Sequence, residues 1–364
     1  MITKQQVLEF LKNYDLDNIT IATVCSHSSL QIFDGARKEG FRTMGGICVG
    51  KPPKFYEAFP PRAKPDEYLI VESYEDIMNK VEELRKKNVI IIPHGSFVAY
   101  LGTENFAEMA VPTFGNRAVL EWESDRSKER EWLLGAGIHM PGKIDDPRDI
   151  NGPVMVKYDG GAKGGKGFFV AKTYEEFDEL VDRTQKYTIQ EFITGTRYYL
   201  HYFYSPPIRN EGYTLSEGSL ELLSMDRRVE SNADEIFRLG SPPRELIEAG
   251  IRPTYVVTGN VPPLVARESL LPPLIFSLGE RVVEESLGLF GGMIGAFCLE
   301  TVFTDELEIK VFEISARIVA GTNLYISGSP PYADLIQEDL STGRRIAQEI
   351  KEAVRKNQLD KIIS

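Results

Sequence analysis

Two glutamates in the last quarter of the chain, Glu300 and Glu313, have the type and spacing of a divalent-cation site. They lie in two apolar runs joined by a polar turn at 304–306, which predicts a β-hairpin over 295–316 with Glu300 directly opposite Glu313. Like charges that face each other across a strand pair are unfavourable unless a cation lies between them. We therefore expect Mg²⁺ here, with Mn²⁺ as an alternative, because hard cations prefer oxygen ligands.

Arg317 follows the second strand of this hairpin. A guanidinium beside a metal site is suited to stabilise the negative charge of a phosphoryl group in transfer, so we list Arg317 as a candidate catalytic residue. The alternative interpretation has one buried glutamate paired with Arg317 and the other at the rim of the hairpin.

A glycine-rich segment over 159–167 lies between two predicted strands, 154–158 and 168–171. It resembles a P-loop, but Gly167 stands where Ser or Thr is required and a strand follows instead of a helix, which excludes a Walker-type NTPase. The chain also lacks the H-R-D and D-F-G sequences of protein kinases. Backbone amides and ammonium groups in such a loop can close over a polyphosphate, although a flexible surface hairpin is the alternative. The candidate ATP-binding residues here are Gly160, Gly161, Lys163, Gly164, Gly165 and Lys166.

Further candidates for nucleotide binding flank this loop. Lys157 lies in the strand that precedes it, and Gln190, Glu191 and Ile193 lie at the end of the strand predicted over 188–193. The strand end offers backbone groups to an adenine edge and a carboxylate to a ribose. Each signal is weak alone, because a solvated lysine and a strand-terminal glutamate are common.

Two loops near the N-terminus contain histidine beside serine: 26–29 after the strand predicted over 19–24, and 94–96 after the strand predicted over 89–92. The carboxyl ends of parallel strands form the usual ligand crevice, and a helix N-terminus favours a phosphate there. We expect His27 and His94 to be functional residues of this crevice, with structural histidines as the alternative. Ser26, Ser28 and Ser29 are expected to form a cradle for a monophosphate, and Ser96 lies in the second loop. We interpret His201 as a core or rim residue.

The elements that position these residues indicate three units in the 364-residue chain. Strands alternate with helices over 1–115, which predicts a Rossmann-like domain with a parallel sheet. A charged helix over 118–135 and the glycine-rich hairpin belong to a small α+β unit over 116–195. Residues 196–364 carry the carboxylate hairpin and a final helix over 340–356. The predicted fold class is therefore mixed α/β and α+β.

Composition excludes several classes of function. The formal net charge of −12 disfavours a nucleic-acid binder, and no apolar stretch is long enough for a membrane span. The N-terminus has no apolar leader, and the 3 cysteines have no metal-binding spacing, so we expect reduced thiols in a cytoplasmic protein without zinc.

The order of these units resembles the ATP-grasp superfamily, in which ATP is held between two α+β subdomains and a carboxylate is activated as an acyl phosphate. The resemblance implies that Lys157 is the strand lysine, 160–167 the cover loop, 190–193 the adenine hinge, and Glu300 and Glu313 the metal ligands. The usual E-x-N-x-R motif reads Glu313-Ile314-Ser315-Ala316-Arg317 here, and Asn323 is a possible replacement for the missing amide.

More closely, several segments resemble the archaeal formate-dependent FAICAR synthetases, the PurP family: ITIATVCSHSSLQIFDGARKEG at 19–40, PHGSFVAY at 93–100, FGNR at 114–117, MDRRVESN at 225–232 and VTGNVP at 257–262. The resemblance implies an ATP-dependent ligase that joins formate to the 5-amino group of 5-aminoimidazole-4-carboxamide ribonucleotide (AICAR) through formyl phosphate, in purine biosynthesis. It also implies that His27, Ser96 and Asn260 contact AICAR, that Glu230 contacts ATP, and that the enzyme is a homo-oligomer.

Two other interpretations stay open. A divergent paralogue could bind purine nucleotides without this activity, and an ATP-grasp ligase could use a larger carboxylate. Retention of Lys157, Glu300 and Glu313 favours an enzyme, because a binding protein has no need of a metal pair.

Overall fold

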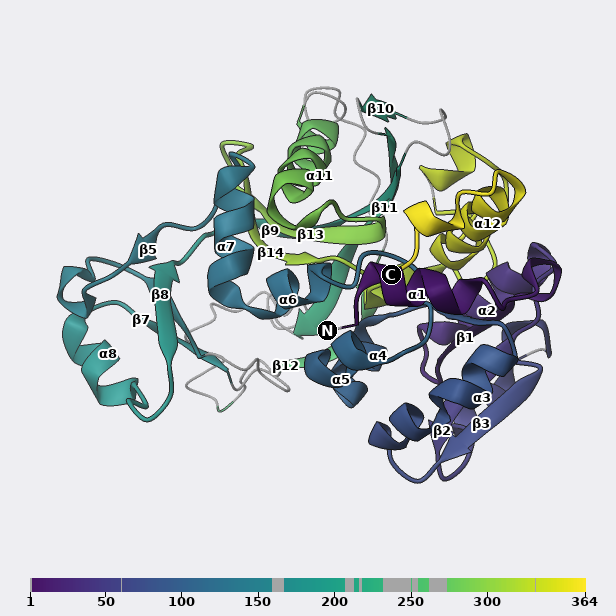
Figure 1. Cartoon of the computed structure of the whole chain (residues 1–364). Helices are drawn as coiled ribbons and strands as arrows, with labels where there is room; N and C mark the ends of the chain where they lie inside the picture. Colours follow the sequence, from purple (N-terminus) through teal and green to yellow (C-terminus); the bar gives the residue numbers. More distant parts are fainter. Residues whose placement is uncertain are drawn as a thin grey trace.

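Three β-sheets with covering helices form the framework of the protein (Figure 1). The computed structural model describes residues 2–59, 61–158, 167–206, 213–215, 218–231, 250, 255–261, 274–330 and 332–364. No helix within these ranges has the length and apolar character needed to cross a membrane.

The first sheet is parallel, as the alternation of strands and helices predicts. Its order is β3-β2-β1-β4, formed by β1 (Thr20–Val24), β2 (Met44–Val49), β3 (Glu67–Val71) and β4 (Val89–Ile91). The helices of this region are α1 (Lys4–Leu11), α2 (Ser29–Lys38), α3 (Val81–Lys86), α4 (Gly95–Leu101) and α5 (Thr103–Glu108). Both crevice loops predicted from the sequence follow strands of this sheet, β1 and β4, which are hydrogen-bonded neighbours. A parallel arrangement therefore brings His27 and Ser96 to the same edge.

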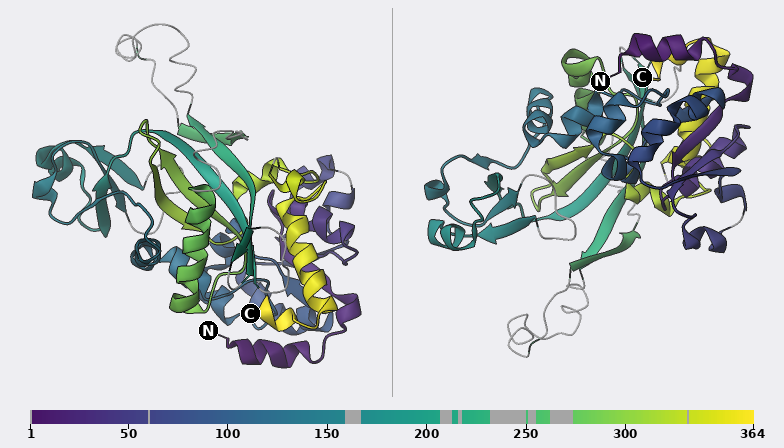
Figure 2. Two further views of the ribbon diagram at one scale, coloured as in Figure 1. Left: turned by 90° about the horizontal axis from the view of Figure 1, so that it is seen from above. Right: turned by 60° about the horizontal axis from the view of Figure 1, so that its bottom comes forward.

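The second sheet is small and antiparallel, in the order β5-β8-β6-β7. It consists of β5 (Lys143–Ile144), β6 (Val154–Tyr158), β7 (Phe168–Ala171) and β8 (Tyr187–Glu191), with α8 (Tyr174–Leu180) alongside. Strands β6 and β7 pair from Val154↔Ala171 to Lys157↔Phe168, so the hairpin predicted around the glycine-rich segment is confirmed. In Figure 2 this sheet and α8 lie at one end of the molecule and the first sheet lies at the other.

The third and largest sheet runs in the order β10-β11-β9-β13-β14, with β12 pairing to β11. Its strands are β9 (Thr196–Ser205), β10 (Tyr213–Leu215), β11 (Gly218–Ser231), β12 (Tyr255–Val261), β13 (Gly295–Phe303) and β14 (Ile309–Ser315). Helix α11 (Ile275–Phe290) covers one face, where Leu278 and Val282 join the core cluster that contains Tyr202 and Leu299. The opposite face of the sheet is turned toward the N-terminal domain, because Phe203 shares a core cluster with Ile90 and Ile318.

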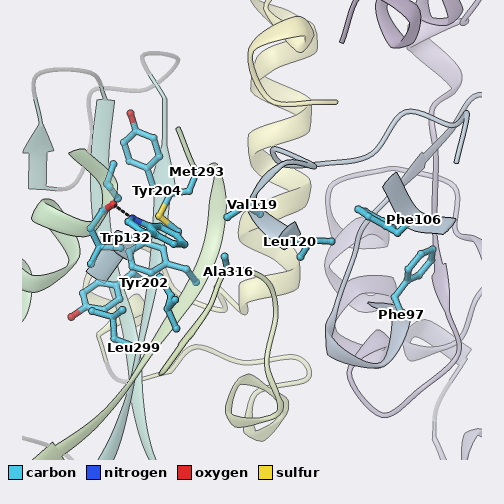
Figure 3. Close-up of a cluster of buried hydrophobic side chains, with 14 of the residues drawn as sticks. Phe97, Phe106, Val119, Leu120, Trp132, Tyr202, Tyr204, Met293, Leu299 and Ala316 are labelled. Atoms are coloured by element: carbon cyan, nitrogen blue, oxygen red, sulfur yellow. Dashed lines mark hydrogen bonds between the residues drawn. The ribbon is translucent and has the colours of Figure 1, made fainter. Parts of the chain in front are cut away.

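The prediction of one helix over 118–135 is wrong in one respect. Two helices occupy this range: α6 (Val119–Ser124) and α7 (Arg126–Gly135). The chain is extended at Asp125, whose carboxylate accepts hydrogen bonds from the amides of Ser127 and Lys128 and so caps α7. Buried side chains of both helices belong to the core cluster of the third sheet. Trp132 lies against Tyr202 and Leu299 and donates from its indole Nε1 to the carbonyl of Val282 at 3.0 Å (Figure 3).

The C-terminal helix, α12 (Thr342–Arg355), returns to the N-terminal domain and packs against α2. The two backbones approach closely at glycines: a Cβ on Gly35 would lie 2.3 Å from the amide nitrogen of Arg344. Each sheet falls within one of the three predicted ranges 1–115, 116–195 and 196–364, whereas α6, α7 and α12 pack across those boundaries. The three-domain division therefore stays a proposal.

Candidate active site

The polar face of the third sheet forms the centre of the candidate site. A row of register partners crosses four strands: Glu313 on β14, Glu300 on β13, Tyr199 on β9 and Asp226 on β11. Side chains alternate between the two faces of a strand, so register partners point to the same side. This side is opposite α11 and faces the N-terminal domain, which places the row where the two regions meet.

Glu300 and Glu313 are register partners, which confirms the prediction made from the hairpin turn. Glu300 is buried, and its pKa rises to about 8, chiefly because burial penalises the charged carboxylate and next because Glu313 is negatively charged. Arg228 and Arg317 oppose this rise. A carboxylate held in this way is poorly stabilised by protein groups alone, so the pair fits a cation.

Arg317 does not pair with either of these glutamates, so the alternative interpretation is wrong on that point. Its Nη2 atom lies 2.7 Å from Oε1 of Glu123 on α6. A Cβ on Gly95 would lie 3.4 Å from its Nη1 atom, which places the guanidinium directly beside the start of α4. Arg317 therefore lies between the crevice of the first sheet and the polar row formed by Glu313, Glu300, Tyr199 and Asp226.

Two acidic side chains from the helices α6 and α7 hold strand β14 at this point, and the sequence interpretation missed both. Glu129 accepts a hydrogen bond from the amide of Ile314 at 2.7 Å, and Glu123 accepts one from the amide of Ala316 at 3.0 Å. Because β14 is an edge strand of its sheet, these amides have no strand partner on that side. The two carboxylates thus fix the backbone on both sides of Ser315, next to Glu313 and Arg317.

Lys157 approaches the row from the small sheet. Its Nζ atom lies 5.4 Å from the ring centroid of Phe312, the neighbour of Glu313. Burial lowers the pKa of Lys157, and the negative charge of Glu313 partly offsets that effect. The predicted strand lysine and the predicted metal carboxylate are therefore brought together.

The strand end at 190–193 is tied to the same hairpin. Glu191 on β8 forms a 2.9 Å ion pair with Lys310 on β14, and it also accepts a hydrogen bond from the amide of Gly142 at 3.1 Å. Its carboxylate is therefore already engaged, which leaves the backbone around Gln190 and Ile193 as the better candidate for adenine contacts.

The two histidine loops differ in a way that the sequence did not indicate. His27 is exposed, and partial burial lowers its pKa, whereas the neighbouring Ser26, Ser28 and Ser29 are buried. His94 is fully buried, and its Nε2 lies 3.0 Å from the carbonyl of Val24, so the expectation that it lies open to a ligand in the crevice is not supported. Ser96 is partly exposed in the first turn of α4, close to the Gly95–Arg317 contact.

Asn260 lies on β12 and donates from Nδ2 to Oδ2 of Asp226 at 2.6 Å. The other oxygen of Asp226 accepts a hydrogen bond from Nε2 of His201. The interpretation of His201 as a core residue is confirmed by its burial, but its link through Asp226 to a predicted substrate-binding residue was missed. No sequence signal points to this link, because the three residues lie on three different strands.

The remaining predicted residues have a limited description or another role. Gly160, Gly161, Lys163, Gly164, Gly165 and Lys166 lie outside the described residues, and Glu230 lies on β11 without a described side chain. Both ends of the Asn323 amide are engaged elsewhere: Oδ1 accepts a hydrogen bond from Gln31 at 3.1 Å, and Nδ2 donates one to Ser28 at 3.2 Å. Its suggested role as a replacement metal ligand is therefore not supported.

Taken together, the described residues place Arg317, Lys157 and the facing pair Glu300 and Glu313 between the histidine-bearing crevice and the end of strand β8. Among these residues no group of three or more His, Cys, Asp or Glu has the arrangement of a metal site. Two carboxylates still fit Mg²⁺, because this ion commonly takes one or two protein carboxylates and completes its shell with water and phosphate oxygens.

Comparison with known proteins identifies the family. A domain of unknown function (DUF1297) matches residues 172–364, and a protein family of unknown function (DUF1246) matches residues 21–144. The chain is 98% identical to the 5-formaminoimidazole-4-carboxamide-1-(beta)-D-ribofuranosyl 5'-monophosphate synthetase 1 of Methanosarcina mazei, over 100% of both chains. The corresponding synthetase of Korarchaeum cryptofilum is 47% identical, again over 100% of both chains. The chain belongs to this synthetase family.

Solved structures agree with this assignment. The IMP biosynthesis protein PurP from Thermococcus kodakaraensis is 31% identical, with a TM-score of 0.70 over 95% of this chain and 100% of that one. N5-carboxyaminoimidazole ribonucleotide synthetase from Thermotoga maritima is similar in fold at 14% identity, with a TM-score of 0.57 over 92% of this chain and 76% of that one. The synthetase family thus has the ATP-grasp fold with a Rossmann-like N-terminal domain. This is the fold class expected from the order of the units in the sequence.

Proposed function

We propose that this protein is an ATP-dependent ligase that formylates the 5-amino group of AICAR with formate. The products are 5-formaminoimidazole-4-carboxamide ribonucleotide (FAICAR), ADP and phosphate. The full-length identity to synthetases named for FAICAR supports the product, and the likeness to an IMP biosynthesis protein supports a place in purine synthesis.

The position of Arg317 is the observation that carries the proposal. Arg317 lies beside Gly95 at the crevice. On its other side, its positive charge opposes the rise in the pKa of Glu300. A phosphoryl group handed from ATP to formate at this point would lie near the guanidinium and the carboxylate row at once. An amine bound in the crevice would then reach the activated formyl carbon.

Two displacements account for the reaction. An oxygen of formate attacks the γ-phosphorus of ATP, which gives formyl phosphate and releases ADP. The 5-amino nitrogen of AICAR then attacks the formyl carbon, the carbon–oxygen bond to phosphate breaks, and the nitrogen loses a proton. Arg317 offsets negative charge on the transferred phosphoryl group, and Lys157 lies where it can bind the phosphate oxygens of ATP.

The metal belongs to this proposal as well. Glu300 and Glu313 would hold Mg²⁺, or Mn²⁺ in its place, and the ion would neutralise charge on the β- and γ-phosphates. The raised pKa of Glu300 supports this assignment, because a bound cation removes the repulsion between the two carboxylates.

Binding roles complete the proposed site. His27, Ser96 and Asn260 would contact AICAR, while the glycine-rich loop, Glu230 and the backbone around Gln190 and Ile193 would contact ATP. We also propose a cytoplasmic homo-oligomer, which binds neither nucleic acid nor membrane.

The decisive experiment mixes the protein with ATP, Mg²⁺ and AICAR, with and without formate, and follows ADP and FAICAR. Formate-dependent release of both products in equal amounts is expected. The same assay is repeated with acetate and with bicarbonate. If ADP is released only with one of these, that carboxylate and not formate is the substrate. Absence of ADP release with AICAR bound would favour a nucleotide-binding paralogue over any ligase.

A further inference from the structure

Asp226 is a buried carboxylate with no part in the proposed chemistry. It lies at the end of the polar row on the third sheet, opposite Tyr199, and is 1% exposed. Burying a charged carboxylate is costly unless hydrogen-bond donors satisfy it. Two donors do so here, one to each oxygen: His201 Nε2 to Oδ1 and Asn260 Nδ2 to Oδ2.

Asp226 and His201 are enclosed by neighbouring parts of the chain. His201 is 3% exposed and lies on the neighbouring strand β9. A Cβ on Gly321 would lie 2.0 Å from Oδ1 of Asp226 and 2.6 Å from Nε2 of His201, so the 3₁₀ turn Ala320–Leu324 closes directly over both groups. Only a glycine permits this approach, and the turn helps to keep both groups out of solvent.

The chemistry of Asp226 determines which way the amide of Asn260 points. A carboxylate accepts hydrogen bonds and cannot donate them, so it selects the NH₂ end of the amide. The carbonyl oxygen Oδ1 of Asn260 is consequently turned away from Asp226. Asn260 is partly exposed, unlike the two residues behind it, and therefore presents an acceptor to the substrate side of the sheet.

We infer that Asp226, held by His201, is a positioning residue that fixes Asn260 as a hydrogen-bond acceptor for a donor group of the nucleotide substrate. This inference rests on the proposed function, because it concerns binding of AICAR. An unrestrained asparagine side chain can present either its carbonyl oxygen or its NH₂ group to a ligand. Asn260 presents only the oxygen, so it disfavours substrates that place a hydrogen-bond acceptor at the same point. Asp226 thus contributes to specificity without touching the substrate.

The first test removes the acceptor. In Asp226→Ala the amide is free to rotate, and we expect the Kd and the KM for AICAR to rise about ten-fold or more, with the KM for ATP changed less than about two-fold. Binding of AICAR alone is measured by calorimetry, without ATP or formate. Ser224→Ala is the matched control, because Ser224 is equally buried on the same strand, is the register partner of His201 and forms no hydrogen bond through its hydroxyl within the described part of the chain.

The second test reverses the polarity of the hydrogen bond and remains decisive if Asp226→Ala folds poorly. Asn260→Asp places two carboxylates face to face, so AICAR binding is expected to fall by about 100-fold. Adding Asp226→Asn restores one donor and one acceptor and still leaves an oxygen of residue 260 toward the substrate. We expect the exchanged pair to recover about ten-fold or more of the lost affinity.

The outcomes separate this inference from the proposed function. Wild-type protein that does not bind AICAR would overturn both. If the wild type binds AICAR, then an Asp226→Ala variant with the affinity of Ser224→Ala, or an exchanged pair no better than Asn260→Asp alone, would overturn the inference and leave the proposed function intact.

Discussion

At the scale of single residues, the site depends on charges that the protein by itself stabilises poorly. Glu300 is buried opposite Glu313, and Glu123 and Glu129 are nearby acids whose pKa values burial also raises, that of Glu129 to about 8. Arg317 and Lys157 supply compensating charge from separate parts of the chain. Such a concentration of perturbed groups in one place is typical of a catalytic centre.

Glu313→Gln tests the metal role directly. The amide keeps the size of the side chain but removes the negative charge, so we expect kcat to fall by about 100-fold or more while the Kd for AICAR stays within about two-fold. Single-turnover assays with Mg²⁺ and calorimetry with AICAR measure the two quantities. Glu308→Gln, at an exposed position on the turn of the same hairpin, serves as the control. An active Glu313→Gln enzyme would refute the assignment.

His94 predicts a pH dependence of stability. Burial lowers its pKa from 6.5 to about 4, so the folded protein binds this proton less readily than the unfolded chain. Neutral, buried His94 therefore contributes to the free energy of unfolding above pH 6.5. This contribution, at most about 3 kcal/mol, is lost as the pH falls toward 4. His94→Gln retains a donor for the carbonyl of Val24 and should lose less stability between pH 7 and pH 5. Urea unfolding at the two pH values measures the difference, and parallel losses in both proteins would contradict it.

At the scale of secondary-structure elements, edge strand β14 is contacted by several separate parts of the chain. Glu123 and Glu129 hold its amides from α6 and α7, β13 pairs with its other edge, and β8 reaches it through the Glu191–Lys310 ion pair. The proposed metal ligand Glu313, the proposed catalytic residue Arg317 and the proposed adenine-binding strand end are thereby positioned relative to one strand.

Lys310→Met is expected to loosen the small sheet from this strand. Removal of the ion pair with Glu191 should raise the KM for ATP by about three- to ten-fold and leave the Kd for AICAR unchanged, because the pair lies beside the strand end that we propose contacts the adenine. A single ion pair that is only partly buried adds little stability, so the melting temperature should move by only a few degrees. Lys143→Met, which removes an ion pair between neighbours on the small sheet, is the control. Equal ATP kinetics in the two variants would argue against the role.

At the scale of the whole molecule, the two ends of the chain are joined. Helix α12 packs on α2, and Arg117 donates hydrogen bonds to the carbonyls of Phe106, Met109, Val111 and Ser364. The N-terminal domain is therefore held to the C-terminal helix and the last residue of the chain by contacts that do not involve His27, Ser96 or Asn260.

Gly35→Ala probes this joint. A methyl group at that position would lie 2.3 Å from the backbone of Arg344, so the helices must separate, and we expect the melting temperature to fall by about 5 °C or more. Gly288→Ala in α11 is the opposite case, because its surroundings are open and alanine favours a helix. That variant should be as stable as the wild type or more so. Similar melting temperatures for both variants would show that α2 and α12 tolerate displacement.

The sequence by itself determined the features that depend on local pattern. A turn between two alternating runs predicted that Glu300 faces Glu313, and the spacing of strands and helices predicted the parallel sheet and its crevice loops. These features follow from local patterns of residue type along the chain, even where the strands that pair lie far apart in it. Only the tertiary structure decided that His94 is buried while His27 is exposed, and that His201 reaches Asn260 through Asp226. These depend on which distant strands pair and on the 3₁₀ turn that closes over them, and such contacts leave no periodic trace along the chain.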